Sequence, residues 1–341
     1  MDRAHRGDRV LSGPSTVLAT PILGAPLTRE LVARIEAIDG VRCALIGSDG
    51  QMHGDADESA FEEADILLLG SVPASVLDRV VSRAPKLRWI HSASAGVDRI
   101  STPIVRERGL LVTNARGVFS QPIAEYVVMM SLAIARRLPH LLELQRERTW
   151  QPLRGRELSE LTVGIIGYGS IGEQVARLLE PFGCRLLATR RHLDRGVGTA
   201  GRVELFALED LAEVLRVSDI VVVAAPLTDE TAGLIGAEQL AEMREDAWLI
   251  NIARGRLIDE LALRRALESG WIGGAVLDVF SEEPLPPDSP LYRTPNLVIT
   301  PHTSWASDRV IERSVDLFVE NLRRDRAGEP LRNVVDLEAG Y

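Results

Sequence analysis

Three residues suited to acid–base and anion-binding chemistry, Arg254, Glu283 and His302, each stand just after a short apolar run in the second half of the chain. Arginine holds a carboxylate through a fork of hydrogen bonds and polarises an adjacent carbonyl. Histidine titrates near neutrality, so it can give or take a hydroxyl proton, and a neighbouring carboxylate fixes its tautomer. Together these residue types predict a hydride-transfer site for a 2-keto or 2-hydroxy acid.

Each of these residues also has an ordinary structural interpretation. A lone Arg254 fits a salt-bridged arginine, and a lone His302 fits a hydrogen-bonded structural histidine. Glu282 and Glu283 fit a solvated pair of loop charges. Their joint placement favours chemistry, because ligands of an open α/β sheet bind beyond the carboxyl ends of its strands.

A glycine-rich stretch supplies the second signal. Gly167, Gly169 and Gly172 form G-x-G-x-x-G between an apolar, strand-like run, Thr162–Ile166, and a helix-like segment, Glu173–Glu180. The spacing permits a tight turn, backbone approach to a pyrophosphate and close packing of helix on strand. The helix N-terminus also favours phosphate. A plain glycine-rich turn is the alternative, but this order of elements predicts a dinucleotide-binding turn.

The elements around these residues alternate between strand-like and helix-like segments. Residues 16–115 form one such series and residues 161–300 form another, so an α/β fold with two Rossmann-like or flavodoxin-like domains and parallel sheets is expected. Pro122–Leu138 predicts a long apolar helix, buried between domains or at a subunit contact. A final helix, about Ser307–Asp325, is expected to return and pack on the first domain.

The totals exclude several classes of function. The 341 residues carry a net charge of −10, which disfavours a nucleic-acid surface. No apolar run approaches the roughly 18 residues of a membrane span. Cys43 and Cys184 lack metal-ligand spacing, so no metal site is predicted. Met1–Arg9 is charged and is expected to be a disordered lead without a secretory signal. These points predict a cytoplasmic protein with a small-molecule substrate and no membrane partner.

Several segments together resemble the D-2-hydroxyacid dehydrogenase family, and in particular its glyoxylate/hydroxypyruvate reductase-like branch. The resemblance covers nearly everything from about residue 40 to about residue 325. The matching segments are Ser94–Asp98, Thr113–Ala115, Ala124–Val127, Ser218–Val221, Pro226–Thr231, Asn251–Gly255, Asp278–Pro284 and Thr300–His302.

The resemblance implies a role for each matching residue. Arg254 binds the substrate carboxylate and carbonyl, His302 is the acid/base, and Glu283 is its partner. Backbone amides near Ala95 and Gly96 hold the substrate carboxylate. The expected cofactor-binding residues are Gly167, Gly169, Ser170, Ile171 and Gly172 of the glycine turn, Pro226, Thr231, Ile252, Ala253 and Asp278 of the matching segments, and Arg190 and Arg191, at which the chain departs from the family pattern.

The resemblance also implies a domain organisation. Residues 1–118 with 304–341 form a discontinuous substrate domain, and residues 119–303 form an NAD(P)-binding Rossmann domain that includes a linking helix region, 121–150. The active site is expected in an interdomain cleft that closes on the ligand. A homodimer built on the cofactor domains is implied as well.

The chain departs from the family pattern at the end of the second strand of the cofactor domain. NAD-binding members carry an acidic residue there, about 20 residues past the glycines, to hold the ribose 2′-hydroxyl. Here Arg190 and Arg191 occupy the position, and no acid appears before Asp194. Because arginine can bind a 2′-phosphate, the sequence predicts that NADP is preferred to NAD. A solvated basic loop with NAD still bound is the alternative.

The leading hypothesis is an NADP-preferring 2-hydroxyacid dehydrogenase that acts as a 2-ketoacid reductase. The alternative is a cofactor-sensing binding protein similar to the C-terminal-binding corepressors; steady NADPH oxidation with 2-ketoacids would distinguish the two. Glu283 argues against a formate dehydrogenase-like branch, in which Gln is expected. The chain ends soon after the last helix, which disfavours phosphoglycerate dehydrogenases with a regulatory extension. The substrate side chain stays open; its candidate determinants are Met52, His53, Ser71–Pro73 and Trp305.

Overall fold

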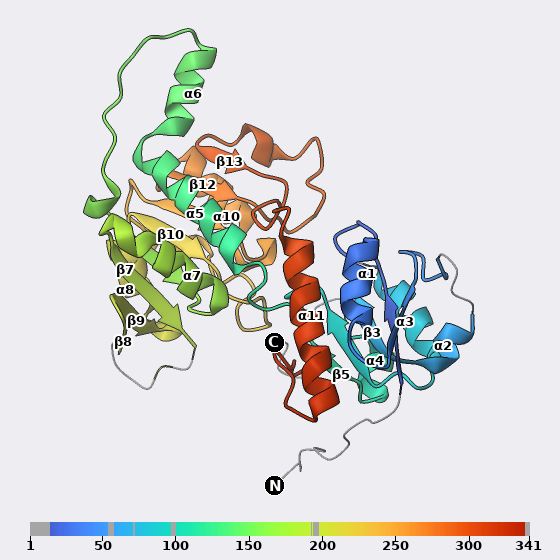
Figure 1. The fold of residues 1–341 in the computed structure, drawn as a ribbon. Helices are drawn as coiled ribbons and strands as arrows, with labels where there is room; N and C mark the ends of the chain where they lie inside the picture. Colours follow the sequence, from blue (N-terminus) through green and yellow to red (C-terminus); the bar gives the residue numbers. More distant parts are fainter. Residues whose placement is uncertain are drawn as a thin grey trace. The chain divides into compact units, whose positions relative to one another are not determined.

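The computed structural model describes residues 14–53, 58–70, 72–96, 100–191, 193 and 198–337. The predicted lead Met1–Arg9, and Ser71, Asp98 and Asp194, lie outside the described residues. The chain divides into two compact units (Figure 1). Unit 1 comprises Met1–Phe119 and Ser307–Tyr341, and unit 2 comprises Ser120–Ala306.

Unit 1 is built on a five-stranded, wholly parallel sheet with strand order β2-β1-β3-β4-β5. Its strands are β1 Ser15–Ala19, β2 Val41–Leu45, β3 Ala64–Leu69, β4 Trp89–Ser92 and β5 Leu111–Thr113. Its helices are α1 Arg29–Glu36, α2 Ser59–Glu63, α3 Ala74–Arg83, α4 Pro103–Glu107 and α11 Val310–Ala327.

The C-terminal helix α11 packs within unit 1, where the final helix was expected. Val315 and Phe318 are fully buried in a core that also holds Val17 of β1 and Trp89 of β4. The end of α11 is tied to the sheet by Asp325. Its carboxylate accepts two hydrogen bonds from the Arg88 guanidinium, at 2.9 and 2.7 Å. This pairing joins residues 237 positions apart, so the two segments of unit 1 fold as one body.

Unit 2 is built on an eight-stranded sheet with order β13-β12-β11-β10-β6-β7-β9-β8, in which only the edge strand β8 runs antiparallel. Its strands are β6 Thr162–Ile166, β7 Arg185–Arg190, β8 Gly198–Ala200, β9 Val203–Ala207, β10 Ile220–Val223, β11 Trp248–Asn251, β12 Gly274–Leu277 and β13 Leu297–Ile299. Its helices are α5 Ser120–Ala135, α6 Leu138–Arg146, α7 Ser170–Leu179, α8 Leu211–Val217, α9 Ala237–Glu242 and α10 Glu260–Glu268.

The strand order of unit 2 reverses between β6 and β10, which creates the switch point where a doubly wound sheet binds its ligand. The predicted α/β fold with parallel sheets is therefore confirmed. Sequence reasoning missed β8 and β9, between His192 and Leu208. The five residues Val203–Ala207 alternate only weakly, and their pairing with β7 decides their state.

Helix α5 is shorter than the predicted helix Pro122–Leu138 at its C-terminal end, and its expected burial between domains or at a subunit contact stays a prediction. It ends at Ala135, and Arg137 takes a left-handed conformation with φ of 56° before α6 begins. Tyr126 and Val127 are buried, but Met129 is 51% exposed in this chain. An apolar surface is therefore left on α5, and it continues along α6.

Candidate active site

Backbone geometry gives each glycine of the G-x-G-x-x-G turn a distinct role. Gly167 has φ of 100°, and a Cβ on it would lie 2.6 Å from the Ala225 backbone nitrogen. A Cβ on Gly172 would lie 2.2 Å from the Gly167 carbonyl oxygen, so the third glycine lets α7 pack against the turn. Nothing in the described structure lies within 4 Å of the Cβ position of Gly169, so a ligand can approach the backbone closely there.

The start of α7 fits a phosphate group. Gly169 is its N-cap and provides no side-chain hydrogen bond, so the amides of the first turn, which includes Ser170 and Ile171, are not capped by that residue. The neighbouring loop after β10 is held by hydrogen bonds among its own residues. The Thr231 hydroxyl donates to the Pro226 carbonyl at 2.7 Å and accepts from the Thr228 amide at 2.8 Å. This use of Thr231 is structural, and its predicted contact with a cofactor stays a prediction.

The two arginines at the end of β7 differ in their surroundings. Arg191 forms an exposed ion pair with Glu230, whereas Arg190 is the exposed last residue of β7. Arg190 acts on Tyr168 in the glycine turn: burial, together with the Glu173 carboxylate, raises the pKa of the Tyr168 phenol, and the Arg190 charge opposes this. Arg190 therefore lies close to the turn that would receive the dinucleotide.

Glu283 and His302 form a pair in unit 2. The His302 Nδ1 lies 2.7 Å from the Glu283 Oε2. The other carboxylate oxygen of Glu283 accepts a hydrogen bond from the Phe280 amide at 2.9 Å, and this bond orients the carboxylate toward the His302 ring. An ionised carboxylate only accepts hydrogen bonds, so Nδ1 carries the hydrogen and Nε2 is left for another partner. Both side chains are partly exposed, at 40% and 36%. Glu282 is exposed and lies outside this pair.

The loop of Arg254 packs against the loop of Glu283. Gly255 has no room for a side chain, because a Cβ there would lie 1.9 Å from the carbonyl carbon of Phe280. The Asn251 side chain closes the turn by donating to the Arg254 carbonyl at 2.9 Å. The Arg254 guanidinium donates to the Ala253 carbonyl at 2.7 Å and is only partly buried. Ile252 and Ala253, which precede it, are buried.

The predicted substrate-binding backbone lies in unit 1. Ala95 and Gly96 follow β4, and the Asn114 side chain donates to the Ala95 carbonyl at 2.8 Å. Since Arg254 belongs to unit 2, their joint action on one substrate stays a prediction.

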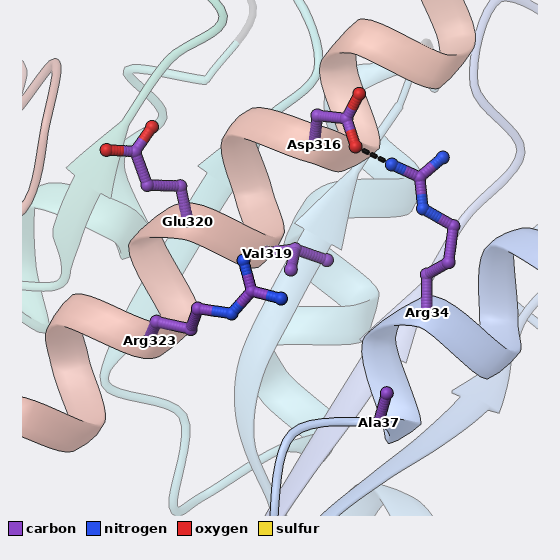
Figure 2. Close-up of a pocket in the computed structure, with 6 residues that line it drawn as sticks. All are labelled: Arg34, Ala37, Asp316, Val319, Glu320 and Arg323. Carbon is purple, nitrogen blue, oxygen red and sulfur yellow. Dashed lines mark ion pairs between the residues drawn. The ribbon is translucent and has the colours of Figure 1, made fainter.

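A surface hollow of about 430 Å³ lies between α1 and α11 in unit 1 (Figure 2). Arg34 and Asp316 of its lining form an ion pair, and Glu320 pairs with Arg324 and Arg332 outside the lining. It is lined by Arg34, Ala37, Asp316, Val319, Glu320 and Arg323. None of the predicted site residues belongs to this lining.

The described part of the chain shows neither a membrane-spanning helix nor a cluster of metal ligands. No helix there combines the length and the apolar character needed to cross a bilayer. No group of three or more His, Cys, Asp or Glu side chains there is arranged to hold a metal ion.

Comparison with known proteins gives the family. The family model for the D-isomer specific 2-hydroxyacid dehydrogenase NAD-binding domain matches residues 128–304. A glyoxylate reductase from Korarchaeum cryptofilum is 38% identical over 269 residues, which are 76% of this chain and 79% of that protein. The chain belongs to the D-isomer specific 2-hydroxyacid dehydrogenases. It is thus an oxidoreductase of this family with an NAD-binding domain.

Solved structures of other family members resemble this dehydrogenase along nearly its whole length. A D-isomer specific 2-hydroxyacid dehydrogenase from Xanthobacter autotrophicus Py2, in complex with NADPH and MES, has a TM-score of 0.83 and 33% identity, and the match covers 97% of this chain and 100% of that one. An NADPH-dependent glyoxylate/hydroxypyruvate reductase from Sinorhizobium meliloti, in complex with NADP and sulfate, has a TM-score of 0.79 and 28% identity, with 96% and 100% covered.

Asp278 has surroundings in this dehydrogenase that its sequence position did not indicate. It is fully buried, and its carboxylate accepts hydrogen bonds from the Thr300 hydroxyl at 2.5 Å and from the amides of Thr303 and Ser304 at 2.9 Å each. The carboxylate is therefore engaged in shaping the loop that carries His302. Its predicted contact with the cofactor stays a prediction.

Sequence reasoning gave no role to Thr300 or Tyr126, although both lie in segments that resemble the family. The two hydroxyls lie 2.7 Å apart, 174 residues apart in the chain. The signal that was available is the Thr300 hydroxyl next to Pro301-His302 and the Tyr126 hydroxyl on a largely apolar helix. Only the packing of α5 shows that these two hydroxyls meet.

Proposed function

We propose that this dehydrogenase reduces a small 2-ketoacid of the glyoxylate or hydroxypyruvate type to the D-2-hydroxyacid, and that it prefers NADPH. The observation that carries the proposal is the 2.7 Å pair of His302 and Glu283 in the same unit as the glycine turn. The substrate class is supported by the glyoxylate reductase and the glyoxylate/hydroxypyruvate reductase among its relatives.

The residues of unit 2 fit a dinucleotide. The Gly169 backbone and the amides at the start of α7 would hold the pyrophosphate. Ala225 would line the floor of the crevice, because it packs against Gly167 at the switch point of the sheet. When bound, the dinucleotide supplies the hydride that reduces the keto carbon.

His302 supplies the proton in the proposed reaction. With Nδ1 donating to Glu283, the protonated ring directs its Nε2 hydrogen to the substrate oxygen, which becomes the hydroxyl. Arg254 binds the carboxylate and stabilises the negative charge that grows on the carbonyl oxygen. The backbone near Ala95 and Gly96 would hold the other side of the carboxylate.

The cofactor preference rests on the end of β7. No acidic residue stands within the described part of this turn, and Arg190 is exposed beside Tyr168. The ion pair of Arg191 with Glu230 is solvent-exposed and therefore contributes little, so Arg191 can exchange it for a phosphate. The NADPH and NADP in related structures support the same preference.

We also propose that unit 2 pairs with a second copy of itself. Figure 1 shows α6 extending beyond the sheet of unit 2. Large apolar side chains are exposed along α5, α6 and the segment that follows. They are Met129, Leu132, Leu138, Leu141, Leu142 and Trp150, with exposed fractions of 51, 37, 45, 37, 43 and 100%. Several large exposed apolar side chains close together in sequence are typical of a protein interface.

The decisive experiment is a panel of 2-ketoacids of graded size, assayed with NADPH and NADH in the unmodified enzyme and in His302→Ala. We expect steady NADPH oxidation with the smallest ketoacids. His302→Ala should lower kcat by about a hundredfold or more, because general acid catalysis is lost, yet bind NADPH normally. A kcat of His302→Ala within about tenfold of that of the unmodified enzyme, or no turnover with any ketoacid, would contradict the proposal.

A further inference from the structure

We propose that Tyr126 and Thr300 are positioning residues: their linked hydroxyls hold the Asp278 carboxylate, and through it the loop that aims His302. This inference rests on the proposed function, in which His302 is the acid. It concerns residues that neither bind the substrate nor exchange a proton with it. All of them belong to unit 2, so the chain of contacts lies inside one compact body.

The hydrogen bonds in this chain have one direction. The Thr300 hydroxyl has a single hydrogen, which it donates to the Asp278 carboxylate at 2.5 Å. Its remaining contact, with the Tyr126 hydroxyl at 2.7 Å, must therefore be one in which Tyr126 donates. The order is tyrosine to threonine to carboxylate. Each donor makes its acceptor's own hydroxyl a better donor, because hydrogen bonds in a chain polarise one another.

Tyr126 keeps its hydrogen over the whole range in which the enzyme can be assayed. It is 9% exposed on α5, and burial raises the pKa of its phenol to about 12; the hydrogen bond with Thr300 opposes this rise, and the Asp278 charge adds to it. Its ring is held by a helix of 16 residues, so the hydroxyl that reaches Thr300 is supplied from a rigid element rather than from a loop.

Asp278 links the Tyr126 and Thr300 hydroxyls to the backbone that carries His302. Its backbone carbonyl accepts the His302 amide at 2.7 Å, and its carboxylate accepts the amides of Thr303 and Ser304. Together with Thr300, four of the five residues from 300 to 304 are bonded to this one aspartate.

The loop needs such support, because His302 has φ of 49°, a left-handed conformation that is strained for a non-glycine residue. A residue in this conformation persists only where its neighbours hold it. The conformation sets the direction of the ring and hence its 2.7 Å contact with Glu283. Loss of the hydroxyl chain should therefore misplace the imidazole without closing or filling the cofactor site.

The test uses Thr300→Val, which keeps the shape and removes the hydroxyl, Thr300→Ser, which keeps the hydroxyl, and Tyr126→Phe. We expect kcat to fall by about tenfold in Thr300→Val, because a small misplacement of a catalytic group is costly, while KM for the ketoacid and the Kd for NADPH change less than about twofold. Thr300→Ser should restore kcat. The kcat of Tyr126→Phe should be about threefold below that of the unmodified enzyme, between the values for Thr300→Ser and Thr300→Val.

A double-mutant cycle separates the chain from two independent effects. Because Tyr126 acts through Thr300, the double variant Tyr126→Phe/Thr300→Val should be no slower than Thr300→Val alone. The controls are Thr294→Val and Tyr292→Phe, which make the same changes elsewhere in unit 2. Thr294 is a buried threonine bonded to the Pro290 carbonyl, and Tyr292 is 54% exposed. Both controls should retain kcat.

Failure of this inference is distinct from failure of the proposed function. A Thr300→Val enzyme with unchanged kcat, beside an inactive His302→Ala, would overturn the positioning role alone. Additive losses in the double variant would overturn the linked chain. Equal losses in Thr300→Val and Thr300→Ser, or a parallel loss of NADPH binding, would show a general structural defect and overturn the inference as well. In the His302→Ala background, Thr300→Val should cause no further loss of residual activity.

Discussion

At the scale of single residues, unit 2 contains glycines at positions that have no space for a side chain. A side chain at Gly172 or Gly255 would meet backbone atoms at 2.2 or 1.9 Å. Arg190 is the opposite case, because it is exposed and its replacement disturbs no packing. Packing therefore does not constrain the residue type at position 190, and a substitution there tests cofactor preference without disturbing the fold.

We expect the unmodified enzyme to have a higher kcat/KM with NADPH than with NADH, and Arg190→Asp to lower that ratio by about tenfold to a hundredfold, because charge-assisted hydrogen bonds to the 2′-phosphate are lost. Steady-state kinetics with both cofactors measure the ratio. Arg202→Asp, at another exposed arginine of unit 2, is the control and should leave it unchanged. Equal kinetics with the two cofactors before mutation would contradict the preference.

At the scale of elements, the contact of β4 with α11 contains a buried histidine. His91 of β4 is fully buried, with its ring centroid 5.3 Å from that of Phe318 on α11. The Trp89 indole donates to the Thr113 hydroxyl at 2.9 Å, and that hydroxyl lies 2.8 Å from the His91 Nδ1. The Thr113 hydroxyl therefore links the two rings inside the core. Burial lowers the pKa of His91 to about 3.

This packing predicts how stability depends on pH. In the unfolded chain His91 takes up a proton near its ordinary pKa of 6.5, whereas in the fold it stays neutral down to about 3. The unfolded state thus binds more protons in this window, and the free energy of unfolding falls as pH falls below 6.5, by about 1.4 kcal/mol per pH unit from this residue. Urea denaturation of His91→Gln at a series of pH values should give a free energy of unfolding that depends less steeply on pH, by about 1.4 kcal/mol per pH unit. The exposed His53→Gln serves as the control, and an unchanged slope in His91→Gln would refute the account.

At the scale of the whole molecule, the apolar surface of α5 and α6 predicts that the protein is a dimer. Leu141→Glu/Leu142→Glu should convert it to a monomer, because charges would be buried at the interface. Sedimentation equilibrium measures the mass directly. Leu261→Glu, at an exposed leucine of α10, should leave the dimer intact. An unmodified protein that sediments as a monomer at micromolar concentration would contradict the prediction.

The sequence by itself determined the fold class and the identity of the candidate chemical groups. Strand, glycine turn and helix around Gly167 are local patterns, and local patterns are legible because a tight turn or an apolar strand admits few residue types. Arg254, Glu283 and His302 were found for the same reason, since each follows a strand end. The weakly patterned β9 was missed, because its state depends on a neighbouring strand.

Only the tertiary structure decided how these groups are held. The convergence of Tyr126, Thr300 and Asp278 depends on side chains brought together from α5 and from the segments that follow β12 and β13. Such contacts join residues up to 174 positions apart, and no periodicity or spacing records them. Hydrogen-bond direction and burial are properties of the packed core, so they emerge only once the strands are in register.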